Sequence, residues 1–453
     1  MEESPLHIVA ELALELAMIL IAAKIGGEIC ERYFKVPAVL GELAAGVLIS
    51  PFALGGIHWF GGGALFPIPV DAAPGVPVKP ELFFVAQVAA IILLFEAGLE
   101  TDRRQFLKYA GPASVVAVGG VIFSFVLGFY ATIAFGFAST DSTQDMLPAL
   151  FVGAVMTATS VGITARVLAD LRRIDSPEGV TILGAAVVDD VLGIIVLAIV
   201  VGIGQEGEVT LSSLAIILVK AVGFWLGLML LGSLVSNHIS RALLWFRSSG
   251  AWVAVAIALA FIAAAVAELY FGLAMIIGSY TLGLALSGTQ LKERIQEPMH
   301  QINWFLVPVF FCVIGMQADF SAFASAEHEF SLFTVVAFSL VLIFLGIISK
   351  VGGAGLPALL VGFNKKGAWR IGVGMLPRGE VALIVAGIGL SSGVVSQLEF
   401  GVSIVMTVAT TVLAPIILVP AFHGGSGLRH PVATNDAVEI EGAQATSGAV
   451  GDE

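Results

Sequence analysis

The amino-acid sequence predicts an all-α polytopic membrane protein with about thirteen transmembrane helices. Hydrophobic residues make up 58% of the 453 residues and charged residues only 12%, which excludes a water-soluble fold. Mean hydropathy is +1.00. The apolar residues also fall into runs of about 20 residues, the length of helix that crosses a hydrocarbon layer of ~30 Å.

Each predicted helix corresponds to one apolar run between polar or turn-forming residues. The runs lie near 7–29, 37–54, 81–100, 107–136, 147–168, 178–203, 210–235, 251–267, 270–288, 302–317, 331–361, 367–390 and 398–421. We therefore expect one membrane domain over 1–421. The segment 422–453 is rich in small, polar and acidic residues and is predicted to be disordered. Because the connections are short, no catalytic module, enzyme activity or cofactor is expected.

Basic residues in the connections predict the orientation of the chain. They occupy every second connection and the tail, at Arg32, Lys35, Arg103, Arg104, Lys108, Arg172, Arg173, Arg241, Arg247, Lys292, Arg294, Lys365, Lys366, Arg370 and Arg429. The other connections are acidic, with Lys79 as their only base. Cytoplasmic loops are enriched in Lys and Arg, so we expect the N-terminus outside and the C-terminus in the cytoplasm, in a cell inner membrane. The net charge of -13 gives no sign of nucleic-acid binding.

Two adjacent carboxylates, Asp189 and Asp190, lie in the middle of the sixth run. A helix is expected to begin near Pro177, because Asp175 and Ser176 supply a cap and proline suits the first helical position. Asp190 then lies ~20 Å along the helix, past the middle of the membrane. A carboxylate is costly at that depth unless it faces a cavity or a partner, so we expect an ion or proton site there.

Three further polar features reach a similar depth. Thr157 to Ser160 interrupt the fifth run, and Pro377, Arg378, Gly379 and Glu380 interrupt the twelfth. Proline and glycine around a buried charge predict a broken helix that lines a cavity. Lys350, in the eleventh run, is placed ~20 Å deep by its distance from Lys365. The two interrupted helices run in opposite directions in the two halves of the chain, which is typical of an inverted-repeat transporter.

The chemistry of these groups suits exchange of a cation for protons. A dehydrated Na⁺ or Li⁺ requires several oxygen ligands. Asp190 and water can supply some of them, and Asp189 or the oxygens of Thr157 and Thr159 can supply the others. Protons compete for the same carboxylates. Arg378 and Glu380 are expected to neutralise the half-helix ends at the break. Alternating access of one such site then gives antiport.

Some of these residues also have structural interpretations. Lys350 either carries a proton and sets the stoichiometry or forms a salt bridge that holds the helices together. The hydroxyls of Thr157 and Thr159 are also compatible with simple helix packing. Glu42 and Glu96 either draw cations toward a funnel or pack at helix ends.

Six stretches together resemble the monovalent cation:proton antiporters, specifically the bacterial Na⁺/H⁺ antiporters related to the Kef-type potassium-efflux exchangers. They are Pro37–Glu42, Leu94–Asp102, Thr157–Ser160, Asp189-Asp190, Lys350 and Pro377–Glu380. The resemblance implies a homodimer in the lipid bilayer, with crossed broken helices in a mobile core. The implied division is scaffold and dimerisation helices over about 7–100 and 251–317, core helices over about 107–203 and 331–421, and a linker helix over about 210–235.

The same resemblance assigns roles to single residues. It implies that Asp190 binds the ion and that Asp189 pairs with Lys350. The potassium-efflux branch resembles this chain less, because it usually has glutamine at the position of Asp189 and adds a nucleotide-binding domain, which is not expected here.

Three other functions fit parts of the pattern. The pattern does not distinguish Na⁺ from K⁺, so a K⁺/H⁺ antiporter stays an alternative. A sodium-coupled organic solute symporter needs neutral oxygens and a larger cavity rather than a charged trio. An intramembrane aspartyl protease needs two aspartates that approach each other, whereas neighbours on one helix point about 100° apart.

Overall fold

The computed structural model describes residues 5–34, 37–58, 63–69, 72, 76–206, 211–246, 250–318, 331–391 and 395–429. Of the segment predicted to be disordered, 430–453 lie outside the described residues, whereas 422–429 are packed against the helices. The described residues 422–429 therefore belong with the helices, and disorder of 430–453 stays a prediction. Composition alone did not show that backbone carbonyls of this segment are held by Asn364 and Arg370.

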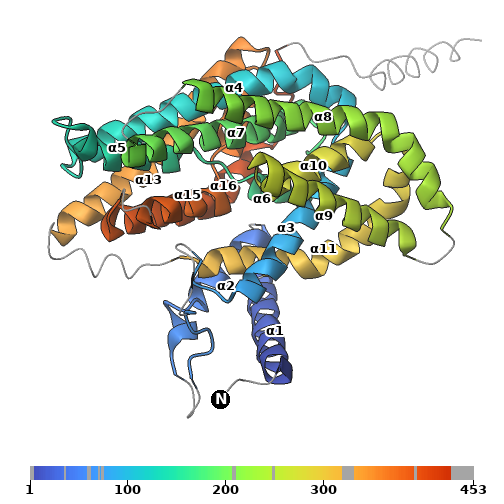
Figure 1. Cartoon of the computed structure of the whole chain (residues 1–453), viewed down its shortest axis with the longest axis horizontal. Helices are drawn as coiled ribbons and strands as arrows, with labels where there is room; N and C mark the ends of the chain where they lie inside the picture. Colours follow the sequence, from blue (N-terminus) through green and yellow to red (C-terminus); the bar gives the residue numbers. More distant parts are fainter. Residues whose placement is uncertain are drawn as a thin grey trace, which may run out of the picture.

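The described chain is almost entirely helical (Figure 1). The first half contains α1 (Pro5–Ile29), the π-helix Cys30–Phe34, α2 (Ala38–Leu48), the 3₁₀-helix Leu54–Gly56, α3 (Pro80–Glu100), α4 (Arg103–Ala134), α5 (Thr143–Thr157), α6 (Val161–Asp170) and α7 (Pro177–Glu206). The second half contains α8 (Leu211–Leu244), α9 (Ala251–Phe271), α10 (Met275–Leu286), α11 (Gln290–Met316), α13 (Leu332–Leu360), α14 (Lys365–Gly374), α15 (Glu380–Ser391) and α16 (Gln397–Ala421).

These helices match the predicted runs one by one. Among the described residues, ten helical spans are long and apolar enough to cross a membrane, with α5 and α6 counted as one span. The shorter apolar helices α2 and α10 and the pair α14–α15 account for the other three runs. The all-helical polytopic fold predicted from hydropathy is confirmed.

Local sequence signals explain where the helices begin. Ser176 caps α7, since its hydroxyl accepts a hydrogen bond from the amide of Gly179, and Pro177 occupies the first helical position as expected. Ser396 and Glu399 form a reciprocal capping box at the start of α16. Asn364 caps α14 by accepting hydrogen bonds from the amides of Lys366 and Gly367.

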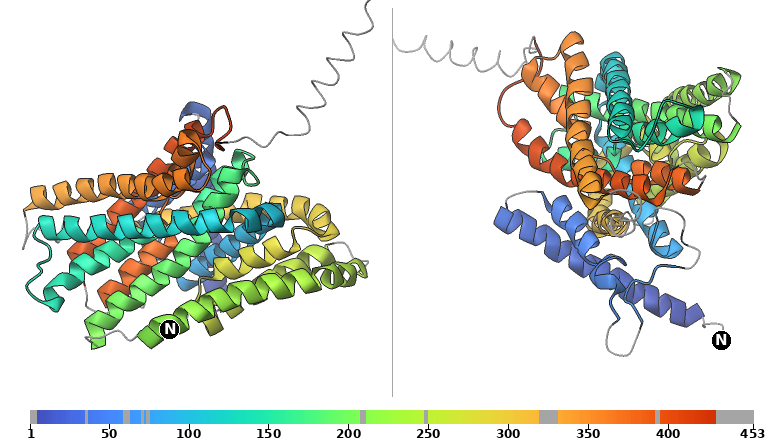
Figure 2. Two further views of the ribbon diagram at one scale, coloured as in Figure 1. Left: turned by 90° about the horizontal axis from the view of Figure 1, so that it is seen from above. Right: turned by 90° about the vertical axis from the view of Figure 1, so that its left-hand side faces the viewer.

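The helices pack as two groups. The core group consists of α4, α5, α6, α7, α13, α14, α15 and α16, and the flanking group of α1, α2, α3, α9, α10 and α11. Helix α8 packs on α9 and α10 of the flanking group and on α7 of the core group. In Figure 1 and in the right-hand view of Figure 2, α1 lies at the edge of the bundle, away from α4, α5 and α13. The two groups meet where α6 packs against α3 and where α16 packs against α2.

Glycines allow the closest helix crossings. A Cβ atom on Gly98 of α3 would lie 2.2 Å from the carbonyl oxygen of Tyr280 on α10, and one on Gly283 would lie 2.2 Å from that of Phe95. Only a residue without a side chain fits such backbone contact. Many of the 52 glycines lie inside apolar helices, and this crossing shows what such glycines achieve.

Candidate functional site

Two broken helices cross in the middle of the core group. Helix α5 ends at Thr157 and α6 begins at Val161, with Ala158 and Ser160 in extended conformations between them. Helix α14 ends at Gly374, and α15 begins at Glu380. The sequence placed both interruptions correctly.

The two breaks are joined directly. The amide of Ser160 donates a hydrogen bond to the carbonyl of Pro377 at 2.7 Å. The hydroxyl of Thr164 donates to the carbonyl of Gly374 at 2.8 Å. Each break thus supplies polar partners for backbone groups that the other leaves outside a helix, as membrane-embedded backbone requires. Thr411 of α16 adds a hydrogen bond from its hydroxyl to the carbonyl of Arg378.

Two buried cations hold the end of α5. Lys350 Nζ donates to the carbonyl of Thr157 at 2.6 Å, and Arg378 Nη2 donates to the carbonyl of Met156 at 2.9 Å. Both side chains are fully buried. The last carbonyls of a helix carry partial negative charge and have no partner within the helix, so cations stabilise them. Arg378 therefore lies where the compensation of a half-helix end was expected, whereas the side chain of Glu380 is outside the described residues.

Lys350 also forms an ion pair with Asp189. Its Nζ lies 3.0 Å from Oδ1 and 3.1 Å from Oδ2 of that carboxylate. Thr159 contributes a hydrogen bond to Asp189, and its hydroxyl lies 3.3 Å from the carbonyl of Met375. One lysine from α13 thus bridges the α5 terminus and the aspartate on α7, and the predicted convergence of these features is observed.

Asp190 occupies the same buried layer and is only 3% exposed. It follows Asp189 on α7, so its side chain leaves the helix in a direction about 100° away. Thr157 packs against α7 about one turn after Asp190. Its Oγ1 would lie 3.9 Å from a Cβ atom placed on Gly193. The Thr157 hydroxyl donates to the carbonyl of Ala154 at 2.7 Å, which leaves its oxygen lone pairs available as acceptors. The site thus brings carboxylate and hydroxyl oxygens together around the aspartate pair.

These oxygens are of the kind that suits a monovalent cation. Among the described residues, no group of three or more His, Cys, Asp or Glu side chains is placed to hold a metal ion. Carboxylates, hydroxyls and backbone carbonyls are the hard oxygen ligands that an alkali cation requires, and a charged acid buried in a membrane span is typical of an ion pathway.

The two other predicted carboxylates, Glu42 and Glu96, lie in the flanking group. Glu96 accepts a hydrogen bond from the amide of Asn303, and its Oε1 lies 3.3 Å from Nδ1 of His300. It lines a cavity of about 230 Å³ between α3, α6 and α11, which also exposes Glu100 and Asp170. Glu42 is buried on α2, outside the lining of that cavity.

Sequence reasoning missed several polar residues. Asn303 and His300 lie at the polar start of the tenth run, where an amide and an imidazole at helical spacing were the available signal. Arg370, counted only as a loop base, is buried and pairs with Glu178 at 2.6 Å. Hydropathy does not identify such pairs, because both partners lie at the ends of apolar runs.

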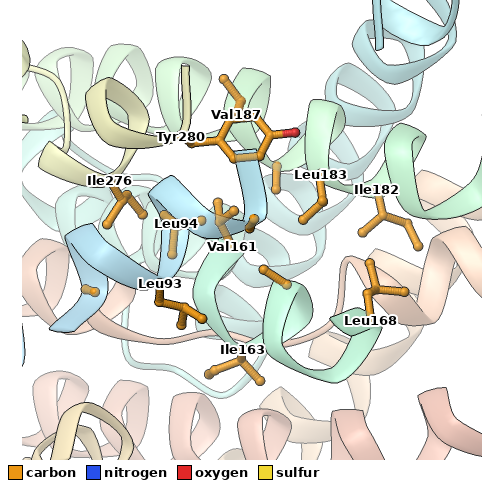
Figure 3. Packing of buried hydrophobic residues seen from close by; sticks show 14 of the residues in the cluster. Leu93, Leu94, Val161, Ile163, Leu168, Ile182, Leu183, Val187, Ile276 and Tyr280 are labelled. Carbon is orange, nitrogen blue, oxygen red and sulfur yellow. The ribbon is translucent and has the colours of Figure 1, made fainter. Parts of the chain in front are cut away.

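The apolar surroundings fix the half-helix α6 between the two groups. Figure 3 shows Val161, Ile163 and Leu168 of α6 together with Leu93 and Leu94 of α3. Residues of α7 and α10 join the same cluster, at Ile182, Leu183, Val187, Ile276 and Tyr280 (Figure 3). The polar breaks therefore lie beside a tightly packed apolar layer that keeps water away from part of the site.

Comparison with known proteins gives the same result as the geometry. Residues 17–424 match the family model described as sodium/hydrogen exchanger, transmembrane. The chain is 37% identical over 440 residues to the high-affinity Na⁺/H⁺ antiporter NhaS3 of Synechocystis sp., covering 93% of this chain and 92% of NhaS3. It is 33% identical over 410 residues to the Na⁺/H⁺-K⁺ antiporter GerN of Bacillus cereus, covering 90% of this chain and 95% of GerN.

The fold is also shared with a solved structure. The sodium proton antiporter MjNhaP1 from Methanocaldococcus jannaschii, at pH 8, superposes with a TM-score of 0.59 at 15% sequence identity, covering 91% of this chain and 99% of that one. Hydropathy, crossed broken helices and the family match all agree. The chain therefore belongs to the sodium/hydrogen exchanger family, the transmembrane antiporters that exchange Na⁺ or K⁺ for protons, and is a transporter rather than an enzyme.

Proposed function

We propose that this protein exports Na⁺ or Li⁺ in exchange for protons, and that Asp189 and Asp190 form the site at which cation and proton compete. The observation that carries the proposal is the contact of Lys350 with Asp189 at 3.0 Å where the two broken helices cross. An acid pair and a lysine buried in an apolar protein interior interact strongly with any charge that enters.

The bound cation takes its ligands from α7 and the α5–α6 break. Asp190 supplies the carboxylate, Thr157 and Thr159 supply hydroxyl oxygens, and water completes the coordination. In the structure Asp189 is paired with Lys350, which also holds the end of α5 at Thr157. Protonation of Asp190 removes the charge that attracts the cation. Protons and cations therefore exclude each other without any further coupling device.

Alternating access follows from movement of the core group relative to the flanking group. The flanking group serves as a scaffold and forms a homodimer, and α8 links it to the core group. In support, α6 meets α3 at a boundary that also contains the 230 Å³ cavity lined by Glu96. Glu96 and Glu42 attract cations toward this boundary. The loop charges favour an N-terminus outside a bacterial inner membrane and a C-terminus in the cytoplasm.

Potassium is the alternative cation. One relative is described as a Na⁺/H⁺-K⁺ antiporter and another, KhtU of Bacillus subtilis at 26% identity, as a K⁺/H⁺ antiporter subunit. The aspartate at position 189 and the 37% identity to NhaS3 favour Na⁺.

The test is cation-dependent proton movement in proteoliposomes, with Na⁺, Li⁺ and K⁺ added separately across a pH range. Wild type is expected to respond to Na⁺ and Li⁺, and Asp190→Asn to lose the response. Asp145→Asn, the same substitution at an exposed residue near the start of α5, serves as the matched control and should retain activity. Normal Na⁺-driven proton movement in Asp190→Asn would remove the ion site from Asp190, and a response to K⁺ alone would reverse the assigned selectivity.

A further inference from the structure

An apolar cavity of about 260 Å³ lies between the core group and α8. Its lining comes mainly from α4, α7, α8 and α10 and is almost entirely apolar; it includes Ala110 and Ser114 of α4, Val188 and Val191 of α7, and Val222 of α8. An apolar cavity of ~150 Å³ in a soluble protein remains dry and binds benzene. This larger cavity therefore suits a hydrocarbon ligand rather than water.

The cavity opens toward the lipid. Its lining residues Leu218, Val222 and Leu226 on α8 are 45%, 44% and 54% exposed, and Ser114 on α4 is also exposed. These residues lie within membrane spans, so their exposed surfaces face the hydrocarbon of the bilayer rather than water. A neighbouring acyl chain enters such a cavity without crossing water, and it restores the van der Waals contacts that an empty cavity lacks.

Two side chains that can bind a polar ligand, those of Trp225 and Arg103, mark the end of the cavity near the start of α4. Trp225 lines the cavity, and its indole N–H is buried without a hydrogen-bond partner among the described residues. Its ring lies 5.9 Å from that of Phe106, which also lines the cavity and follows Arg103 by three positions. Buried tryptophans normally find an acceptor, so this donor lacks an oxygen atom that a ligand can provide.

Arg103 supplies a positive charge at the same end. It lies on the face of α4 that lines the cavity, because residues 103, 106, 110 and 114 recur at helical spacing. None of the ion pairs among the described residues includes Arg103. The first amides of α4 are occupied by the carboxylate of Asp102, so an anion at this end would be held by the arginine side chain rather than by the helix terminus.

We propose that this cavity is a binding site for an anionic phospholipid of the membrane. One acyl chain fills the cavity, an ester carbonyl accepts the hydrogen bond from Trp225, and the headgroup phosphate pairs with Arg103. Basic residues at the end of a membrane helix recognise such headgroups. The bound chain contacts Val188 and Val191, the neighbours of the aspartate pair on α7, and excludes water from that side of the ion site. The proposal does not depend on which cation is transported.

The experiment measures quenching of Trp225 by brominated acyl chains. A protein variant is made that keeps Trp225 and has phenylalanine in place of the other five of the six tryptophans. It is reconstituted into vesicles of phosphatidylcholine. Brominated phosphatidylglycerol or brominated phosphatidylcholine is then titrated in. We expect half-maximal quenching at about fivefold lower mole fraction of phosphatidylglycerol, since one basic residue near the membrane surface contributes about that factor. Equal quenching by the two lipids would overturn the proposal.

Three variants separate the contacts. Arg103→Gln should remove the preference for phosphatidylglycerol and leave quenching by phosphatidylcholine. Ser114→Phe fills the cavity and should abolish quenching at low mole fraction by either lipid. The matched control is Val115→Phe, which adds the same side chain to the lipid-exposed side of α4 outside the cavity lining and should change neither titration. If quenching at low mole fraction of brominated lipid persists in Ser114→Phe, the acyl chain binds outside this cavity.

A second measurement does not require tryptophan replacement. Native mass spectrometry of the full chain, released from micelles containing both lipids, should show bound phosphatidylglycerol in wild type and in Val115→Phe. The Arg103→Gln and Ser114→Phe variants should retain severalfold less. Equal retention in all four proteins would contradict the proposed site.

Discussion

Lys350 Nζ lies 3.0 Å from the carboxylate of Asp189, across 161 positions of sequence, and both side chains are fully buried. The same nitrogen donates to the carbonyl of Thr157 at 2.6 Å. This lysine therefore has two partners, an acid on α7 and a helix end on α5. Its role in stability and its role in transport are expected to be separable by experiment.

Replacing Lys350 by methionine should be more destabilising than removing both partners of the ion pair. The single change leaves a buried carboxylate without a counter-charge, which costs about 3–5 kcal/mol. The double variant Lys350→Met with Asp189→Asn should recover about 0.5–3 kcal/mol of that loss. Chemical unfolding in detergent micelles measures both values, and additive losses in the double variant would argue against the pair.

Transport is expected to depend on membrane potential. A lysine that gains and loses a proton during the cycle adds a second proton for each cation, so the exchange moves net charge. The measurement is the reversal potential of reconstituted wild type under opposing Na⁺ and pH gradients. A rate unaffected by an imposed potential would assign Lys350 a purely structural role.

Arg378→Lys should destabilise the protein although the charge is retained. Arg378 contacts the carbonyl of Met156 through Nε and Nη2, at 3.3 and 2.9 Å, and that of Gly346 through Nη2 at 3.4 Å. A lysine cannot reproduce this planar arrangement, and each buried hydrogen bond lost costs about 1–3 kcal/mol. Arg173→Lys, at an exposed position, is the matched control in thermal unfolding. Equal melting temperatures of the two variants would contradict the role given to Arg378.

Gly98→Ala should loosen the contact between α3 and α10. The new Cβ would lie 2.2 Å from the carbonyl oxygen of Tyr280, so the helices must separate, at a cost of about 1–3 kcal/mol. Gly223→Ala on α8 meets nothing within 4 Å and should be neutral or stabilising by up to about 1 kcal/mol. Thermal unfolding of both variants checks the contrast, which disappears if the crossing is not tight.

Truncation should locate the true end of the packed domain. Removing 430–453 is expected to change stability by less than about 0.5 kcal/mol. Removing 422–453 also deletes the carbonyls of Phe422 and Gly424, which accept hydrogen bonds from Arg370 at 3.4 and 2.6 Å. The second truncation should cost about 1–3 kcal/mol more. Unfolding in detergent compares the two chains, and identical stability would show that the 422–429 segment contributes nothing.

Much of the architecture could be predicted because hydropathy and backbone chemistry act locally. The apolar runs marked the helices, and the Pro377–Gly379 and Thr157–Ser160 interruptions marked the breaks. Counting residues also placed Lys350 and the aspartates at a common depth. These inferences required only the rise of a helix and the cost of polar groups in lipid.

The remaining features depend on how each helix is rotated about its axis and on which helices are its neighbours. The depth of a residue in the membrane determines neither. The contact of Lys350 with the Thr157 carbonyl and the burial of Arg370 against Glu178 are of this kind. The cavity beside Trp225 likewise arises where apolar residues of four helices meet, none of which is unusual alone. The packed 422–429 segment was missed because polar composition resembles disorder even where backbone carbonyls accept hydrogen bonds from Asn364 and Arg370.

The attachment of 422–429 has a practical consequence. Asn364 and Arg370 tie this segment to α14, one half of a broken helix at the proposed ion site. A fluorophore placed just after Arg429 therefore reports the position of that half-helix. With a second label before α3, near Lys79, the distance between the two fluorophores reports the relative position of the two helix groups. Following that distance in a single molecule times each step of a transport cycle.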